Sequence, residues 1–157
     1  MSATTRTYVV AALSLILAGA LAVPTAILAQ SVADPERAAL LEAEAARLHQ
    51  LPNRWADAAS LYRAAADLRQ REDPQARQDL FVAANLSYQL GDRPAAVTAL
   101  ESAGSRALSA GDSVFATEMF ANAAGIAQEA GMVEHERRLR SRVADLAGAT
   151  GVRRGSS

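Results

Sequence analysis

The side chains best suited to chemistry in this sequence are few and widely spaced. Histidine occurs only as His49 and His135, and cysteine does not occur at all. A metal centre needs several such ligands close together, and a disulfide or a thiolate nucleophile needs cysteine. We therefore expect no metal site, no cofactor and no thiol chemistry.

Two pairs of carboxylates could suggest acid–base catalysis. Glu42 and Glu44 are two residues apart, as are Glu134 and Glu136. Residues at this spacing point to different sides of a helix, so neither pair forms the facing carboxylates of a glycosidase. The sequence also lacks a nucleophile elbow, a phosphate-binding loop and the zinc-protease motif. We expect a protein without catalytic residues, and not an enzyme.

A basic patch near the C-terminus is the next candidate, formed by Arg137, Arg138, Arg140 and Arg142. Residues 132–157 carry six arginines against three acids, whereas residues 30–131 carry nine arginines against fourteen acids. Such a patch could dock on an anionic membrane surface or an acidic partner, or be the solvated face of a terminal helix. Nucleic acid is not expected, because no aromatic side chains are interleaved with the arginines.

A stripe of aromatic and amide side chains is the third candidate. Phe81, Asn85 and Tyr88 lie at i, i+4 and i+7, which places them on one side of a helix. Rings supply contact area, and an amide can pair with a peptide backbone, so the stripe suits peptide recognition. The alternative is that both rings pack against a neighbouring helical hairpin.

The first 29 residues have the pattern of a secretory signal peptide. Arg6 precedes an uncharged run, residues 8–23, and Pro24 is followed by small residues, with cleavage expected after Ala29. Sixteen helical residues span roughly 24 Å, short of a ~30 Å hydrocarbon core. We expect an exported protein, periplasmic or secreted. The alternative is an uncleaved membrane anchor formed by residues 8–29.

The rest of the chain predicts paired helices. Asp34-Pro35, Asp73-Pro74 and Asp112-Ser113 recur every 39 residues, and Asp before the first helical residue is a strong start signal. Turn residues interrupt each following run. The expected helices are 35–51 with 54–71, 74–90 with 93–109, and 113–130 with 133–148.

Small residues recur at fixed places in these hairpins. Each set also contains one large residue. The second hairpin has Ala84, Gly91, Ala96, the large Leu100 and Ala103. The first has, at the same offsets, Ala46, Asn53, Ala58, the large Tyr62 and Ala65. Small side chains let paired helices cross closely, while the larger one fills the space beside them. The pattern resembles the tetratricopeptide repeat. The third hairpin departs from it, because Glu136 and Arg140 replace the alanine and the large apolar residue.

The resemblance implies an all-α fold of three stacked helix-turn-helix hairpins, an α-solenoid with a right-handed superhelix. It covers residues 34–148, with repeats of about 34–72, 73–111 and 112–150, and leaves a disordered tail at 149–157. The last helix carries a narrow apolar stripe of Leu139, Val143 and Leu146, as a capping helix should.

The resemblance also implies a concave face made by the first helix of each hairpin. The positions carried over are Gln78, Phe81, Asn85, Tyr88 and Gln89, with Arg47, Gln50 and Gln128 from the other hairpins. The family's lysine clamp for carboxylates cannot form, because the chain has no lysine. We expect a scaffold of the cell envelope that binds a protein or peptide partner, with self-association possible. The alternative is an envelope accessory protein that docks through the basic patch.

Overall fold

The computed structural model describes residues 33–154, and the side chains of residues 33–149. These residues form six α-helices and one short 3₁₀ turn: α1 (Pro35–His49), η2 (Pro52–Arg54), α2 (Trp55–Asp67), α3 (Pro74–Gln89), α4 (Arg93–Ser109), α5 (Ser113–Glu129) and α6 (Val133–Arg154). No strand occurs among them, so the predicted all-α class is confirmed for this part of the chain.

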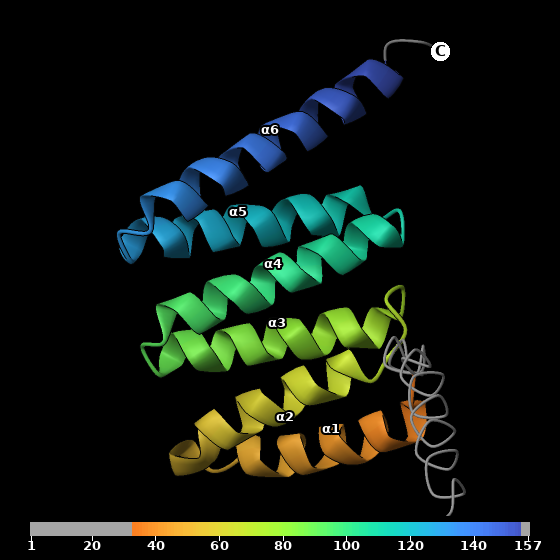
Figure 1. The fold of residues 1–157 in the computed structure, drawn as a ribbon, viewed down its shortest axis with the longest axis vertical. Helices are drawn as coiled ribbons and strands as arrows, with labels where there is room; N and C mark the ends of the chain where they lie inside the picture. Colours follow the sequence, from red (N-terminus) through yellow and green to blue (C-terminus); the bar gives the residue numbers. More distant parts are fainter. Residues whose placement is uncertain (1–32, 155–157) are drawn as a thin grey trace, which may run out of the picture. The chain divides into compact units, whose positions relative to one another are not determined.

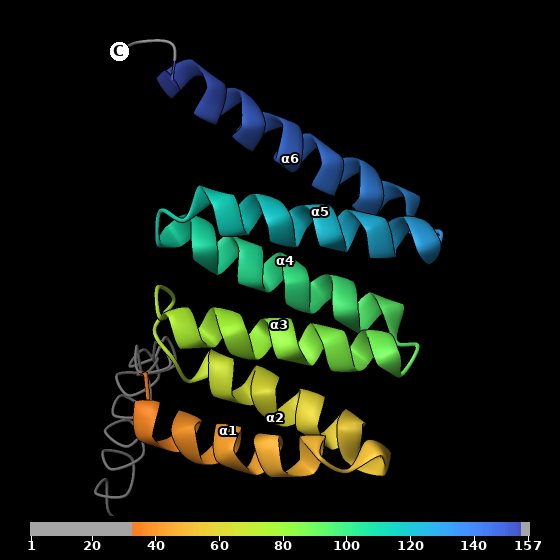
Figure 2. The same cartoon turned by 180° about the vertical axis from the view of Figure 1, so that it is seen from behind.

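The helices are stacked in chain order. Each helix packs mainly on the one before it and the one after it, and the chain runs back and forth as the stack grows from α1 to α6 (Figures 1 and 2). In such a stack, the sides of a helix that face neither the preceding nor the following helix have no main helical neighbour. These sides are where the fold can present side chains to a partner.

Aspartates begin the helices as the sequence predicts. Oδ1 of Asp34 accepts from the amide of Arg37 at 3.0 Å, and Oδ1 of Asp112 accepts from that of Phe115 at 3.1 Å. Asp73 caps α3 in the same way. Each side chain satisfies an amide that the first helical turn leaves free.

Glycines end three of the helices. Gly91, Gly111 and Gly131 have φ values of 81°, 77° and 68°, the left-handed conformation that glycine adopts without strain. After α3 the amide of Asp92 returns to the carbonyl of Ser87 at 2.9 Å, which closes a Schellman motif. The connections 90–92, 110–112 and 130–132 are therefore alike, and each reverses the chain within three residues.

The core consists mostly of alanine. The predicted crossing residues Ala84, Ala96, Leu100 and Ala103 are all buried, with at most 3% of their surface exposed. The apolar stripe of α6 is also confirmed, since Leu139 is fully buried and Val143 and Leu146 pack against the same core. The small side chains explain how the helices pack closely.

The register of the first hairpin differs by one residue from the prediction. Ala45 is fully buried, whereas Ala46, which was predicted to occupy the place that Ala84 has in the second hairpin, is exposed. The cause lies in the connection: residues 50–54 join α1 to α2 and include η2, whereas only 90–92 join α3 to α4. Asn53 accordingly lies in η2 and not at a glycine-type turn.

Three helix ends also differ. α1 ends at His49 and not at 51, and α2 ends at Asp67, four residues before the predicted end at 71. The carbonyl of Leu68 accepts from the amide of Asp34 at 2.7 Å, so the start of α1 ties down the chain just after α2. α6 continues to Arg154, through the first part of the stretch predicted to be a disordered tail.

The predicted signal peptide or anchor, residues 1–29, lies outside the described residues. Among the helices that are described, none has the length and the apolar character needed to span a lipid bilayer.

Candidate partner-binding surface

The outer edge of α3 presents the predicted stripe. Gln78, Asn85 and Gln89 are exposed, and Phe81 is half-buried, with its inner side packed against the core. These residues follow one another at helical spacing and line the edge that α2 and α4 leave uncovered. The edge therefore combines free amide groups with a ring that the core holds in place.

Tyr88 is fixed at the end of this stripe by contacts to two other helices. Its hydroxyl donates to Oε2 of Glu129 in α5 at 3.0 Å. Cζ of Arg93 in α4 lies 4.0 Å from the ring centroid, a cation–π contact. Arg93 also donates to the Tyr88 carbonyl at 2.8 Å and lies 3.6 Å from Glu129. The ring is thus oriented before any partner arrives.

The aromatic stripe was predicted either to bind a peptide or to pack against a neighbouring hairpin, and these contacts agree in part with each prediction. Phe81 packs against the core, as the packing alternative predicts, yet each ring keeps a half-exposed side. Tyr88 bridges α3 and α5 by its hydroxyl. The rings lie where the hairpins meet and on the free edge at the same time.

α5 continues the surface. Gln128 is exposed and accepts from Nη2 of Arg140 at 2.9 Å. Asn122 is exposed as well, on the edge of α5 that also includes Glu118 and Gly125. Sequence reasoning missed Asn122, and the repeat gives no signal for it: the corresponding residue of α3, forty residues earlier, is Val82, which is half-buried.

The two predicted residues of α1 have a different setting. Arg47 is exposed and pairs with Glu44 at 2.6 Å on the surface of the same helix. Gln50 is exposed and follows the last residue of α1. Both lie in the first hairpin, whereas the stripe lies on α3 of the second.

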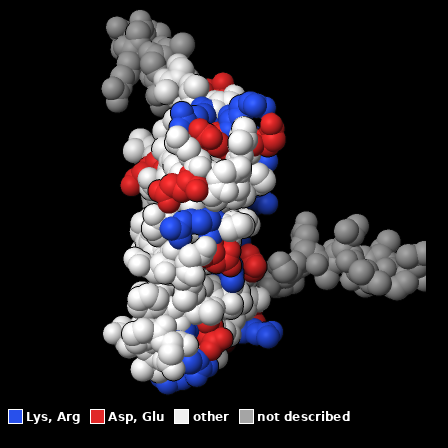
Figure 3. Space-filling view, turned by 90° about the vertical axis from the view of Figure 1, so that its left-hand side faces the viewer, with Lys and Arg blue, Asp and Glu red and all other residues white. Residues whose placement is uncertain are grey.

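Three of the four arginines of the basic patch are paired with acids. Each of its arginines contacts an acid or a ring: Arg137 with Glu134 at 2.8 Å, Arg138 with Glu101 at 2.6 Å, Arg140 with Glu136 at 3.0 Å, and Arg142 over Phe120 at 4.3 Å. On the face seen in Figure 3, basic and acidic side chains lie next to one another and not in areas of one sign. These pairs reduce the local positive potential that docking on an anionic surface would need.

The histidines take structural positions. His49 is the last residue of α1, and its ring meets that of Tyr62 edge-on at 6.3 Å. Its carbonyl accepts from the indole of Trp55 at 3.0 Å. Within the described residues, no three acidic or histidine side chains are arranged to hold a metal ion.

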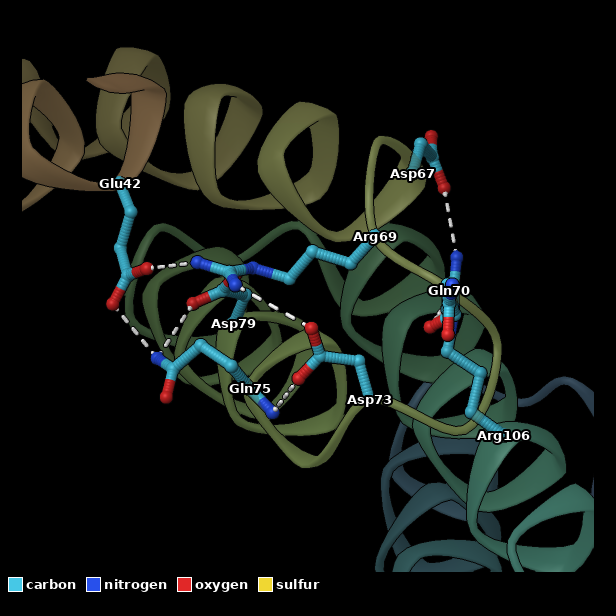
Figure 4. Close-up of polar contacts among 8 residues, drawn as sticks. All are labelled: Glu42, Asp67, Arg69, Gln70, Asp73, Gln75, Asp79 and Arg106. Carbon is cyan, nitrogen blue, oxygen red and sulfur yellow. Dashed lines mark hydrogen bonds and ion pairs between the residues drawn. The ribbon is translucent and has the colours of Figure 1, made fainter. Parts of the chain in front are cut away.

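A partly buried polar cluster, which sequence reasoning missed, joins the first two hairpins. We call Glu42, Arg69, Asp73, Gln75 and Asp79 the junction cluster (Figure 4). Arg69 leaves the end of α2 and reaches Glu42 of α1 at 2.5 Å, Asp73 at 3.5 Å and Asp79 of α3 at 3.4 Å. Gln75 donates to Glu42 at 2.7 Å and to Asp79 at 3.3 Å.

Asp79 is the most deeply placed member of the cluster, with 1% of its surface exposed. Burial raises the pKa of its carboxyl to about 6, and repulsion from Glu42 adds to the rise, while Gln75 and Arg69 oppose it. Nε of Arg69 and Oδ2 of Asp79 face each other, yet neither makes a hydrogen bond among the described residues. The cluster is therefore compact but incompletely satisfied.

Comparisons with known proteins add no relative: no family model matches the chain, and neither a curated protein nor a solved structure matches it. The tetratricopeptide resemblance therefore remains a prediction from the residues quoted above.

Proposed function

We propose that this protein is a non-enzymatic scaffold of the cell envelope that holds a segment of a partner protein along α3 and α5. The proposed fold is a tetratricopeptide-like α-solenoid with a right-handed superhelix. Export rests on the leader pattern of residues 1–29, and binding rests on the stripe of α3.

The observation that carries the proposal is the preorganised edge of α3. Three exposed amides, Gln78, Asn85 and Gln89, alternate with Phe81 and Tyr88, whose rings are already held by the core and by Arg93 with Glu129. Exposed amides can donate to and accept from an extended peptide backbone. Fixed rings lose little conformational entropy when a partner covers them, which favours binding.

The partner is best trapped by photocrosslinking. Amine-directed reagents are unsuitable because the chain has no lysine. We would place a photocrosslinking amino acid in place of Asn85 and, as a control, in place of Thr98, which is exposed on α4. The proposal predicts that a defined partner is crosslinked from position 85 in the intact envelope or the secreted fraction, and not from position 98.

A second measurement separates binding from folding. The triple change Gln78→Ala, Asn85→Ala and Gln89→Ala should abolish the crosslink from Asn122 on α5 while leaving the melting temperature unchanged. The control triple Ser60→Ala, Thr98→Ala and Ser109→Ala removes exposed hydroxyls elsewhere and should keep it. Equal crosslinking by both triples would show that α3 is not the binding edge.

A further inference from the structure

The junction cluster carries more acid than base. Glu42, Asp73 and Asp79 contribute three carboxylates, and Arg69 is the one guanidinium that contacts all three. Asp79 is buried, and the side chain of Arg69 is only 11% exposed. Water cannot compensate such an imbalance at a buried position, so one carboxyl is expected to take up a proton when the cluster forms.

The position of the cluster gives this proton a structural consequence. Glu42 belongs to α1, Arg69 to the segment that follows α2, and Asp79 to α3. The contacts join the first hairpin to α3, and the same elements share an apolar cluster that includes Leu48 and Leu86. A change of charge here should therefore alter the packing between the first hairpin and α3 more than the packing of α5 or α6.

We propose that the junction cluster is a proton-linked joint: mild acid tightens the packing of the α1–α2 hairpin on α3, and neutral pH loosens it. The proton resides on Asp79, whose carboxyl is the least accessible to water. The raised pKa of that carboxyl agrees with this assignment. The joint works independently of which partner the scaffold binds.

The charged groups around Asp79 are accounted for on every side. α1 supplies Glu42, the connecting segment supplies Arg69 and Asp73, and α2 supplies Tyr62, whose pKa burial raises, with the charges of Asp79 and Glu42 adding to the rise. The charged side chains of α4 are bound elsewhere: Arg93 to Glu129, Glu101 to Arg138, and Arg106 to Asp67. We therefore assign the pH response to the junction cluster.

Hydrogen exchange followed by mass spectrometry can test the joint in the full chain. We expect the opening equilibrium of α1 and α2, corrected for the intrinsic exchange rate, to rise about tenfold from pH 5 to pH 7.5. Amides of α5 should show a much smaller change. Asp79→Asn should make α1 and α2 equally protected at both pH values, whereas Glu118→Gln, which removes an exposed carboxyl on α5, should keep the tenfold change.

Two results would overturn the proposal: a wild-type opening equilibrium of α1 and α2 that does not change with pH, or the same change in Asp79→Asn. If Asp79→Asn does not fold, the same hydrogen-exchange measurement on Glu42→Gln tests the proposal. Removing that negative charge lowers the pKa of Asp79, so the transition should move to lower pH. An unmoved transition in Glu42→Gln also refutes the joint.

Discussion

The ring of Phe120 occupies the space beside Gly104 so closely that a Cβ at residue 104 would lie 2.7 Å from Cε1 of the ring. Gly104 belongs to α4 and Phe120 to α5, and both are buried. The guanidinium of Arg142 covers the ring at 4.3 Å from its centroid, which restricts its movement. The glycine is thus required by packing and not by backbone conformation.

Gly104→Ala should therefore destabilise the fold. Alanine in a helix gains about 0.5–1 kcal/mol over glycine, but overpacking a tight core costs about 1–3 kcal/mol. We expect a net loss of about 1 kcal/mol in the free energy of unfolding, measured with urea. The matched control is Gly125→Ala in α5, where a Cβ meets nothing within 4 Å; it should stabilise by about 0.5–1 kcal/mol. A stabilising Gly104→Ala would contradict the packing of α4 on α5.

A second prediction tests the register of the first hairpin. Ala84→Leu should lower the free energy of unfolding by about 1–3 kcal/mol, because Ala84 is 1% exposed where the helices cross. Ala46→Leu should change it by less than about 0.5 kcal/mol, because Ala46 lies on the surface. Urea unfolding of both variants gives the comparison. Equal losses would mean that Ala46 is buried and the one-residue shift is wrong.

The helices of this chain could be predicted from local signals. Asp34, Asp73 and Asp112 begin helices because their side chains bind nearby amides, and that chemistry depends only on adjacent residues. Glycine at 91 and 131 ends helices for an equally local reason. Boundaries set by such caps were right to within a residue or two.

The end of α2 and the junction cluster could not be predicted in this way. Arginine is a good helix former, so nothing near Arg69 indicates that the helix ends at Asp67. Its partners Glu42 and Asp79 are distant in sequence, and Asp79 follows exposed Gln78, so its burial is not visible from its neighbours. The pairing of Arg138 with Glu101, which neutralises part of the basic patch, could not be predicted either, because these two residues are also distant in sequence.

A third prediction concerns the guanidinium at the centre of the junction cluster. Arg69→Gln leaves the carboxylates of Glu42, Asp73 and Asp79 without their shared cation, so we expect a loss of about 3 kcal/mol in the free energy of unfolding at pH 7.5. In the Asp79→Asn background one of these charges is already gone, and the loss should be smaller by about 1 kcal/mol.

A double-mutant cycle of the four proteins, followed by urea unfolding, measures this coupling. The control is the surface pair of Arg54 with Asp57 at 2.6 Å, both about half exposed. Arg54→Gln should cost less than about 1 kcal/mol, as exposed ion pairs generally do. Additive losses for Arg69 and Asp79 would show that the two side chains do not interact.

The fourth prediction is the pH dependence of stability. The pKa of Asp79 is raised from 3.8 to about 6 in the folded chain, so the folded state holds a proton that the unfolded state releases. The stabilisation from this proton is complete below about pH 4 and disappears as the pH rises through about 6. Acidifying from pH 7.5 to 5 should therefore raise the free energy of unfolding by about 1 kcal/mol, measured by urea titration.

Asp79→Asn removes the titrating group and should abolish this gain, while its stability at pH 7.5 should equal or exceed that of the wild type. The direction is diagnostic, because carboxylates stabilised by ion pairs in the folded state have lowered pKa values and make proteins less stable in acid. Glu44, whose pKa is lowered by its hydrogen bond to Arg47, is an example; Glu44→Gln should leave the gain from pH 7.5 to 5 in place. A wild-type chain that loses stability when the pH falls from 7.5 to 5 would show that Asp79 is already ionised at pH 5. An Asp79→Asn chain that still gains stability would show that another group takes up the proton.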